Sequence, residues 1–396
     1  MAEVKELPPP GDCILFSTAD WDEPYWTNKQ HTAVELARLG WRVLYVESVG
    51  MRAPRPGSGR DWRRLSNRFY KGLASLLLGA TQRAPGIFVL SPLMMPAGHH
   101  HPFWSRVNRW LLQMAIWRFA VRKGFKSPLV WTYHPFMLSV LLGLKPRALL
   151  YHCVDDLAAV PGVNAKAFRR AEDELLRSAS VVFVTAPSLV EKCKTINRNT
   201  HYLPNVVDAS HFGRALLPGP IPEDLMVIPQ PRIGYHGVLS DFKIDFQLLL
   251  DCARKKPEWN WVFIGEEREG QRSPLIAELK KLPNIHFLGY RSYEVLPEYL
   301  RGIHVGILPS LVNEYTKGMF PMKFYEYLAA GVPVVSTPLD FARDTNYAFS
   351  VASGTEDFIF AISRHLKQER MSDSQVRDLI GMNTWKKRTE SMLLEI

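Results

Sequence analysis

The sequence predicts an α/β protein built from two domains, each with a parallel sheet covered by helices. The chain has 396 residues, which is more than one hydrophobic core usually supports. Short apolar runs alternate with helical patterns in both halves of the chain, as is typical of parallel sheets covered on both faces. Residues 209–231 interrupt the alternation with a stretch rich in proline and glycine, which favours a linker. We therefore predict two Rossmann-like domains, at residues 1–208 and 232–365, followed by a helical segment at 366–396.

In the first predicted domain, short apolar runs indicate buried strands. These runs are residues 13–17, 41–47, 129–132, 148–153 and 181–185. Helical patterns cover residues 31–39, where Gly40 ends the pattern, and residues 165–178.

The same alternation returns in the second predicted domain. Its strands are predicted at residues 232–235, 259–264, 285–288, 304–308 and 332–336. The predicted helices between them cover residues 246–255, 274–282 and 322–330. Strands separated by helices in this way indicate parallel pairing.

The composition, with 46% apolar and 22% charged residues, is that of a folded protein. The arrangement of the cysteines favours a reducing compartment. The four cysteines lie far apart without a CxxC pair, which argues against a disulfide framework or a zinc site. The first residues, MAEVKELPPPGD, lack the features of a signal peptide. No apolar run reaches the roughly 18–20 residues that span a bilayer. We therefore expect a cytoplasmic protein.

The net charge of +10 indicates an anionic partner. Basic residues concentrate in residues 52–71 and in residues 103–126, and the second segment also contains Trp104, Trp110 and Trp117. Tryptophan suits a bilayer interface and arginine pairs with lipid phosphate, so the expected partner is an anionic membrane surface that holds the protein peripherally. The alternative is an ordinary packing helix with a basic exposed face. Nucleic acid is not expected, because no recognised nucleic-acid-binding motif accompanies the charge.

The most informative stretch is residues 321–338, PMKFYEYLAAGVPVVSTP. Pro321 suits the start of a helix, where unpaired backbone N–H groups and the helix dipole favour a phosphate. Lys323 in the first turn opposes that dipole unless an anion lies beside it. Glu326, one turn later, can accept hydrogen bonds from the two hydroxyls of a ribose. A diphosphate and a ribose are parts of a nucleotide sugar. An ordinary amphipathic helix with a stray lysine is the alternative.

This stretch resembles the donor-binding helix of GT-B glycosyltransferases. The likeness is greatest to family 4 and to the related teichuronic-acid and xanthan-type glucuronosyltransferases. Further segments resemble the family in order and spacing: residues 151–157, 203–212, 232–239, 257–265 and 283–290. The resemblance implies a GT-B fold, with an N-terminal acceptor-binding domain and a C-terminal donor domain that face each other across a cleft.

The implied reaction transfers a sugar from a nucleoside-diphosphate sugar, expected to be UDP-linked, to an acceptor hydroxyl. The implied acceptor is a glycolipid or oligosaccharide, such as a lipid-linked or cell-surface polysaccharide precursor. No cofactor and no metal ion are expected, because lysine and the helix dipole stabilise the leaving diphosphate.

The resemblance also implies roles at the donor site. Met322 and Lys323 would lie against the diphosphate, and Glu326 would hold the ribose. Tyr290 would flank the base, and Gly237 would let the backbone approach the phosphates closely.

Two positions depart from the family pattern. Lys243 falls where family 4 places a phosphate-contacting lysine, but Val238 stands in place of the accompanying arginine. Gly318 stands where retaining enzymes carry a glutamate, eight positions before the one that binds ribose. Polar residues nearby are candidates to replace that glutamate: Asn313, Glu314 and Lys317. The enzyme inverts if they do not, so the stereochemistry stays open.

Asp155 and Asp156 end a predicted strand of the first domain, where open parallel sheets place their sites. A carboxylate there could take the acceptor proton as a general base, as inversion requires. We favour Asp155, because the resembling motif has its acid at that position. The alternative for such a pair is an N-cap of the following helix.

Residues 20–31 follow the first strand, where the family forms an acceptor loop. The candidate acceptor-binding residues in it are Asp20, Trp26, Asn28, Lys29 and His31. Trp21 and Trp26 could instead simply anchor the loop. The histidines at positions 99–101 invite a metal hypothesis, but we expect them to be solvated.

Two other functions remain as alternatives. One is a sugar-nucleotide epimerase or another Rossmann enzyme, such as an NAD-dependent oxidoreductase, although no GxGxxG follows the first strand. The other is a catalytically inactive scaffold in a polysaccharide assembly complex.

Overall fold

The computed structural model describes residues 6–48, 72–73, 75, 79–93, 102–267, 273–342 and 345–396. The chain divides into two compact units. The first comprises Met1–Thr185, Leu189–Leu203 and Thr389–Ile396, and the second comprises Ala186–Ser188 and Pro204–Arg388. Each unit is built on a parallel sheet with helices on its faces, which confirms the predicted α/β class with two Rossmann-like domains.

The first unit has an eight-stranded sheet in the order β3-β4-β2-β1-β5-β6-β7-β8. Only β3 and β4 pair antiparallel within it. The strands are β1 (Asp12–Phe16), β2 (Arg42–Val46), β3 (Thr81–Ala84), β4 (Ile87–Leu90), β5 (Leu129–Thr132), β6 (Ala148–Cys153), β7 (Val181–Val184) and β8 (Thr200–Tyr202). Strands β3, β4 and β8 were not predicted from the sequence: β3 and β8 are short and largely polar, whereas the apolar run of β4 was overlooked.

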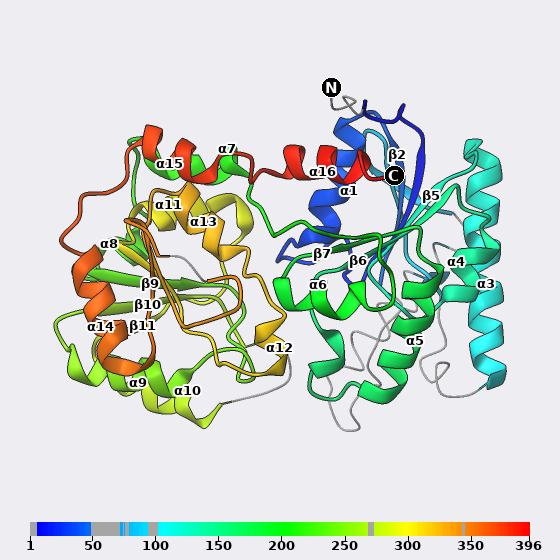
Figure 1. Ribbon diagram of the computed structural model, residues 1–396. Helices are drawn as coiled ribbons and strands as arrows, with labels where there is room; N and C mark the ends of the chain where they lie inside the picture. The colour runs from blue at the N-terminus through cyan, green and yellow to red at the C-terminus, as the bar shows by residue number, and fades with distance from the viewer. Residues whose placement is uncertain are drawn as a thin grey trace. The chain divides into compact units, whose positions relative to one another are not determined.

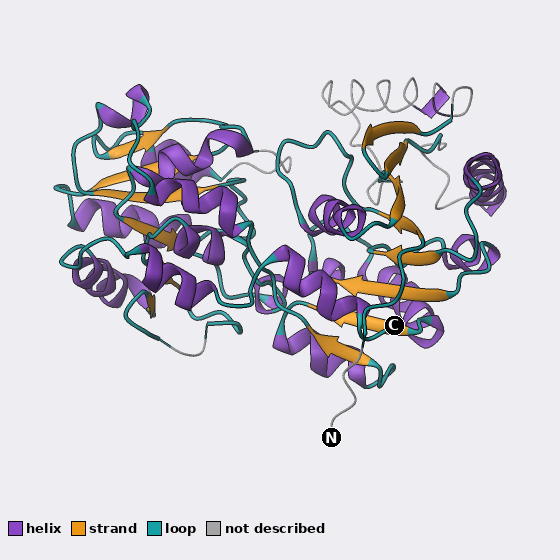
Figure 2. Ribbon diagram, turned by 90° about the horizontal axis from the view of Figure 1, so that it is seen from above, coloured by secondary structure: helices purple, strands orange, loops and turns teal. Residues whose placement is uncertain are grey.

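Helices lie on both sides of this sheet (Figure 2). They are α1 (Asn28–Arg38), α3 (Pro102–Lys123), α4 (Leu138–Gly143), the short η1 (Leu157–Ala159), α5 (Ala165–Ser178), α6 (Pro187–Lys194) and the end of α16 (Trp385–Leu393). In α5 the side chain of Asn164 caps the helix by accepting a hydrogen bond from the Ala167 N–H. Phe168, Leu175 and Leu176 then lie buried at helical spacing.

The second unit has a six-stranded parallel sheet in the order β11-β10-β9-β12-β13-β14. Its strands are β9 (Arg232–His236), β10 (Asn260–Ile264), β11 (Ile285–Phe287), β12 (Val305–Leu308), β13 (Val334–Ser336) and β14 (Phe349–Val351). Its helices are α7 (Ala209–Phe212), η2 (Gly213–Leu216), α8 (Glu223–Met226), α9 (Phe246–Lys255), α10 (Pro274–Leu279), η3 (Tyr293–Val295), α11 (Leu296–Arg301), α12 (Glu314–Lys317), α13 (Lys323–Ala329), α14 (Gly354–His365) and α15 (Asp373–Ile380).

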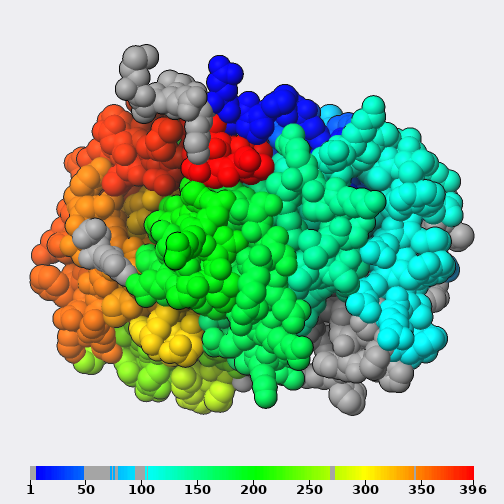
Figure 3. All heavy atoms as spheres, turned by 45° about the vertical axis from the view of Figure 1, so that its right-hand side comes forward, coloured from blue at the N-terminus to red at the C-terminus, as the bar shows by residue number. Residues whose placement is uncertain are grey.

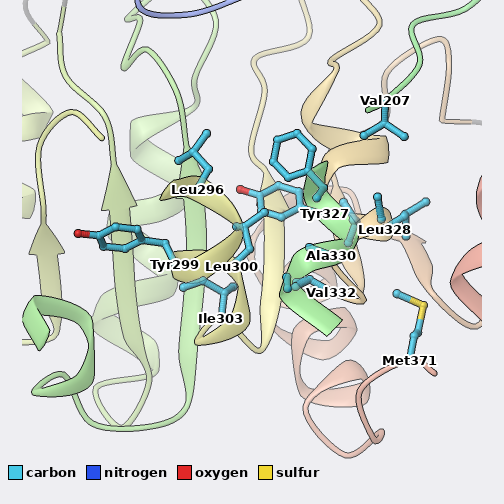
Figure 4. Packing of buried hydrophobic residues seen from close by; sticks show 14 of the residues in the cluster. Val207, Leu296, Tyr299, Leu300, Ile303, Tyr327, Leu328, Ala330, Val332 and Met371 are labelled. Carbon is cyan, nitrogen blue, oxygen red and sulfur yellow. The ribbon is translucent and has the colours of Figure 1, made fainter. Parts of the chain in front are cut away.

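Alternate residues of these strands belong to two cores, one on each face of the sheet. In β10, Val262 and Ile264 pack with α11 and α13, whereas Trp261 and Phe263 pack with α9. Figure 1 shows α11, α13 and α15 on one side of the sheet and α9, α10 and α14 on the other. Because both faces are covered, the strands are mostly apolar, which is why the sequence pattern revealed them. Figure 4 shows Tyr327 of α13 within the first of these cores.

Residues 209–231, which we expected to be a linker, are instead part of the second unit. Phe212 and Leu225 from this stretch are fully buried in its core. Prolines and glycines break the stretch into helices of only four residues, and such short helices show no periodicity in the sequence. The segment at 366–396 is helical as predicted, but residues 389–396 belong to the first unit.

Candidate active site

Lys323 lies directly against the backbone at the carboxyl end of β9. Gly237 follows this strand with a φ of +111°, which L side chains rarely adopt. A Cβ atom at Gly237 would lie 2.5 Å from Lys323 Cε and 2.8 Å from Lys323 Nζ. A Cβ atom at Gly265, after β10, would lie 1.9 Å from the Gly237 carbonyl oxygen. Gly237 therefore leaves room for the Lys323 ammonium group, and Gly265 leaves room for the Gly237 backbone, where open parallel sheets hold their ligands.

Glu326 is buried one turn further along the same helix. Its side chain is near His236, the last residue of β9, with 3.4 Å between Glu326 Oε2 and His236 Nε2. Burial raises the pKa of Glu326 to about 7, and the nearby Lys323 ammonium opposes this rise. Burial and Lys323 together lower the pKa of His236 well below its usual range, so the imidazole is neutral. The cluster therefore combines one cation with a carboxyl group that can exchange a proton near neutral pH.

Tyr327 joins the helix that carries Lys323 and Glu326 to strand β9. Its hydroxyl donates to the Gly234 carbonyl at 3.0 Å and accepts the His236 backbone N–H at 3.1 Å. The Tyr327 ring is fully buried, and a Cβ atom at Gly306 would lie 2.6 Å from it. Because this contact fixes α13 against the sheet, it also fixes the distance between Lys323 and Gly237.

The other predicted donor residues lie in the same unit. Met322 immediately precedes α13 and is half-buried. Tyr290 is half-buried in the loop after β11. Lys243 Nζ lies 5.0 Å from the ring centre of Phe242 and 5.3 Å from that of Tyr315. The contacts of the described residues thus bring Gly237, Lys323 and Glu326 together, with His236 as a member that the sequence analysis missed.

The polar residues near Gly318 make local contacts at the short helix α12. Asn313 caps it by accepting hydrogen bonds from the N–H groups of Tyr315 and Thr316. Glu314 and Lys317 form an exposed ion pair of 2.9 Å. These contacts explain the residues locally and leave the stereochemistry open.

Asp155 and Asp156 follow β6 in the first unit, as predicted. The Asp156 side chain makes no capping hydrogen bond to η1, so the N-cap explanation is wrong for this residue. Asp156 Oδ1 instead lies 3.2 Å from Lys192 Nζ, which also contacts Glu172 Oε2 at 2.7 Å. Glu172 is fully buried and accepts a hydrogen bond from the Tyr151 hydroxyl at 2.7 Å. Asp156 is therefore part of a structural ion-pair network, whereas Asp155 is a half-buried carboxylate at the strand end.

Three of the predicted acceptor-binding residues lie in a helix, where the sequence had suggested a loop. Helix α1 begins at Asn28, three residues before the predicted start, so Asn28, Lys29 and His31 lie in its first turns and are buried. The earlier start comes from a capping box between Thr27 and Gln30, which the sequence analysis did not recognise.

Trp26 and its neighbours anchor this region. The Trp26 ring lies 5.6 Å from that of Trp21 and 5.4 Å from that of His31. The Asp20 carbonyl accepts a hydrogen bond from Gln30 Nε2 at 3.1 Å. These contacts agree with the anchoring hypothesis, and they leave an acceptor role untested.

The residues around the first turn of α1 include two that the sequence analysis missed. Lys29 Nζ lies 5.4 Å from the ring centre of Tyr133, and the Tyr133 hydroxyl is 3.0 Å from His152 Nδ1. Tyr133 directly follows β5, and His152 belongs to β6. The sequence contains no spacing signal for this group, because strand pairing alone brings it together.

Helix α3 contains the second basic segment and an apolar stripe. Phe103, Trp110, Trp117 and Val121 are between 57% and 63% exposed, and their spacing places them on one face of the helix. Leu112, Ile116 and Phe119 are buried on the opposite face. The helix has no acidic residue in its 22 positions. The residues of α3, cyan in Figure 3, form part of the molecular surface. We call Phe103, Trp110, Trp117 and Val121 the α3 stripe.

The remaining expectations concern metal binding, membrane-spanning helices, two segments outside the described residues, and the cysteines. Within the described ranges, no cluster of His, Cys, Asp and Glu side chains could hold a metal ion. Every helix of the described part is too short or too polar to cross a membrane. The histidines at 99–101 and the basic residues of 52–71 lie outside the described residues. The four cysteines are buried and free.

Comparison with known proteins finds a family match to the second unit and a matching fold. Residues 230–368 match the family described as "Glycosyl transferases group 1", and this range contains Gly237, Lys323 and Glu326. The complete chain has the GT-B fold of two Rossmann-like domains.

One curated relative matches part of this chain in sequence. A Bacillus subtilis protein, TuaH, named for a glycosyltransferase of teichuronic acid biosynthesis, is 34% identical over 141 residues. That match covers 34% of this chain and 35% of TuaH, so it spans about a third of the relative's length.

Solved structures show the same fold at low identity. Sucrose-phosphate synthase from Thermosynechococcus elongatus has a TM-score of 0.69 at 14% identity, covering 96% of this chain and 97% of that one. A glycosyltransferase from Rickettsia africae has a TM-score of 0.66 at 14% identity, covering 97% of each chain. Anabaena HepE, solved in complex with UDP-glucose, has a TM-score of 0.61 at 15% identity, covering 96% of this chain and 94% of HepE.

Proposed function

We propose that this chain is a glycosyltransferase that moves a sugar from a UDP-linked donor to an acceptor hydroxyl. The observation that carries the proposal is the Lys323 ammonium packed against Gly237, one helical turn from the buried Glu326, within a glycosyl transferases group 1 domain. The complex of HepE with UDP-glucose supports a nucleotide sugar as the donor.

In the proposed mechanism, Lys323 neutralises the charge that develops on the departing diphosphate. A cation fixed beforehand beside the leaving group stabilises the transition state without reorganisation, so the proposal requires no metal ion or cofactor. Glu326 accepts hydrogen bonds from the ribose hydroxyls and so orients the donor. Gly237 allows the phosphates to approach the backbone, and Met322, Lys243 and Tyr290 complete the proposed donor site.

Asp155 is the proposed general base if the reaction inverts. It follows β6 at the edge of the sheet where parallel α/β proteins bind ligands. The proposed acceptor region includes Asp20, Trp26, Asn28, Lys29 and His31 at the start of α1.

The proposed acceptor is a lipid-linked or cell-surface polysaccharide precursor, and the proposed location is the cytoplasmic face of an anionic membrane. The name of TuaH supports a role in making a cell-wall polymer. The α3 stripe supports the location, because exposed aromatic side chains beside Arg106, Arg109 and Arg118 suit lipid tails and headgroup phosphates together.

The test is the Lys323→Ala variant, assayed for UDP affinity by calorimetry and for sugar transfer. Loss of a hydrogen bond to a charged group should weaken UDP binding by about 1.5–3 kcal/mol. Lys317→Ala, which removes an exposed lysine of the same unit, is the matched control and should bind UDP normally. Unchanged affinity in Lys323→Ala would exclude the donor site.

Product analysis with the wild-type protein separates the alternatives. A transferase releases UDP only when an acceptor or water takes the sugar. An epimerase converts the sugar of the donor and releases no UDP, and an inactive scaffold yields neither product.

A further inference from the structure

His236 is a buried titratable residue to which the proposed mechanism gives no role. Its side chain is 4% exposed, and its Nε2 atom makes no hydrogen bond to any described residue. Glu326 Oε2 lies 3.4 Å from it. Glu326 is itself only 7% exposed. Two buried polar groups at this distance require an explanation, because a buried polar atom without a partner is costly.

The His236 ring is held in its orientation by Tyr327. The two rings meet edge to face, with centres 4.9 Å apart and an angle of 74° between their planes. The His236 backbone N–H also donates to the Tyr327 hydroxyl. Tyr327, which contacts the His236 ring, directly follows Glu326 on α13. The imidazole of His236 and the carboxyl group of Glu326 are therefore held in position relative to each other.

We propose that His236 is a positioning residue for Glu326, whose Nε2–H donates to one carboxylate oxygen and leaves the other for the donor ribose. This inference rests on the proposed donor site. A ribose offers two hydroxyl donors, and an ionised carboxylate accepts such hydrogen bonds more strongly than a neutral carboxyl group does. A neutral imidazole supplies a hydrogen bond to that ionised form without adding a second cation beside Lys323.

Donor binding should therefore be coupled to one proton. The groups that face Glu326 are Lys323 and Tyr327 from α13, His236 from β9 and Tyr293 from η3. Burial raises the pKa of Glu326 to about 7, so the ligand-free carboxyl group is partly protonated at neutral pH. Ribose binding favours the ionised form. Affinity should fall as the pH drops below about 7, with release of a proton on binding.

The first experiment measures UDP affinity by calorimetry between pH 6 and pH 9 for the wild type, His236→Phe and His236→Gln. Phenylalanine removes the N–H, so the pH midpoint of binding should rise by about one unit, with about fivefold weaker binding at pH 7 and near-normal binding at pH 9. Glutamine places an amide N–H near the position of Nε2 and should restore the midpoint. A loss of affinity that is equal at every pH would overturn the proposal.

A second nucleotide isolates the ribose. 2′,3′-Dideoxyuridine diphosphate lacks the ribose hydroxyls, so its affinity should vary with pH only through its own terminal phosphate, which has a pKa of about 6. That affinity should be the same in wild type and His236→Phe at every pH. A pH dependence equal to that of UDP would contradict a role through Glu326. If His236→Phe does not fold, His236→Asn serves instead, because its shorter side chain does not reach Glu326.

A ligand-free measurement keeps this inference separate from the proposed function. The unfolding free energies of wild type, His236→Phe and Glu326→Gln are compared between pH 4 and pH 9. A carboxyl group whose pKa is raised in the folded state stabilises the fold below its unfolded pKa of about 4.3, and loses this contribution as the pH rises through its folded pKa. Wild-type stability relative to Glu326→Gln should therefore fall up to about pH 7.

In the His236→Phe background, measured relative to the double variant His236→Phe/Glu326→Gln so that the titration of His236 cancels, this fall should continue about one pH unit further, because the ionised carboxylate has lost its donor. An identical fall in the two backgrounds would refute the coupling of His236 to Glu326. If UDP does not bind to the wild type while the curves differ as expected, the proposed donor function fails and the His236–Glu326 coupling stands.

Discussion

Single residues at the end of β9 determine how closely a ligand can approach the backbone. Gly237→Ala introduces a methyl group at φ +111°, within 2.5 Å of Lys323 Cε. We expect a stability loss of about 1–2 kcal/mol from the backbone alone and a weaker UDP affinity, because Lys323 must move. The measurements are urea unfolding and calorimetry. Gly213→Ala is the control: its φ is −59° and nothing lies within 4 Å, so it should be neutral or slightly stabilising.

Asp155 and Asp156 differ in their surroundings and should differ when changed. Asp155→Asn should leave UDP affinity intact and reduce sugar transfer by about 10²–10⁴-fold, the usual contribution of a general base. Asp156→Asn should keep transfer and lose about 0.5–1 kcal/mol of stability, because it weakens a partly exposed pair with Lys192. Transfer rates and unfolding curves for both variants decide the matter. Full activity in Asp155→Asn would mean that the base lies elsewhere or that the reaction retains configuration.

Helix α3 is the element for which we predict a membrane contact. Binding to phosphatidylglycerol vesicles should fall steeply with added salt, because exposed charges are screened within about 8 Å at physiological ionic strength. The double variant Trp110→Ser/Trp117→Ser should bind the vesicles more weakly even at low salt. Phe360→Ser, at a 72% exposed position of α14, is the control and should bind like the wild type. Equal sedimentation with neutral and anionic vesicles would exclude the contact.

At the scale of the whole molecule, the chain returns to its first unit after completing the second. Met392 and Leu393 of α16 are 1% and 2% exposed in the core that also contains Leu36 of α1. Met392→Ala should therefore cost about 2–5 kcal/mol in urea unfolding, as large-to-small core changes do. Met382→Ala, at a 67% exposed position, should change stability by less than about 0.5 kcal/mol. Equal effects of the two changes would show that the return adds nothing to the core.

The sequence predicted most of the buried strands and several helices of the second unit. Residues 246–255 were expected to be helical, and α9 spans Phe246–Lys255. Its buried face repeats at helical spacing, so local pattern and packing agree. The stretch 209–231 was misread, because Phe212 and Leu225 are buried by helices too short to show a period. The start of α1 was placed three residues late, because its capping box lies in an aromatic-rich stretch.

The sequence by itself determined the fold class and the part of the donor cluster that lies on one helix. Lys323 and Glu326 are three positions apart, so any helix places them on adjacent turns, and their resemblance to a known motif needed no tertiary information. Tertiary structure alone decided their surroundings. His236 is distant in sequence from Glu326, and β9 and α13 meet through tertiary packing in which the Tyr327 hydroxyl donates to the Gly234 carbonyl. The pKa of Glu326 depends on burial, which is a property of the packed molecule and not of any local stretch of chain.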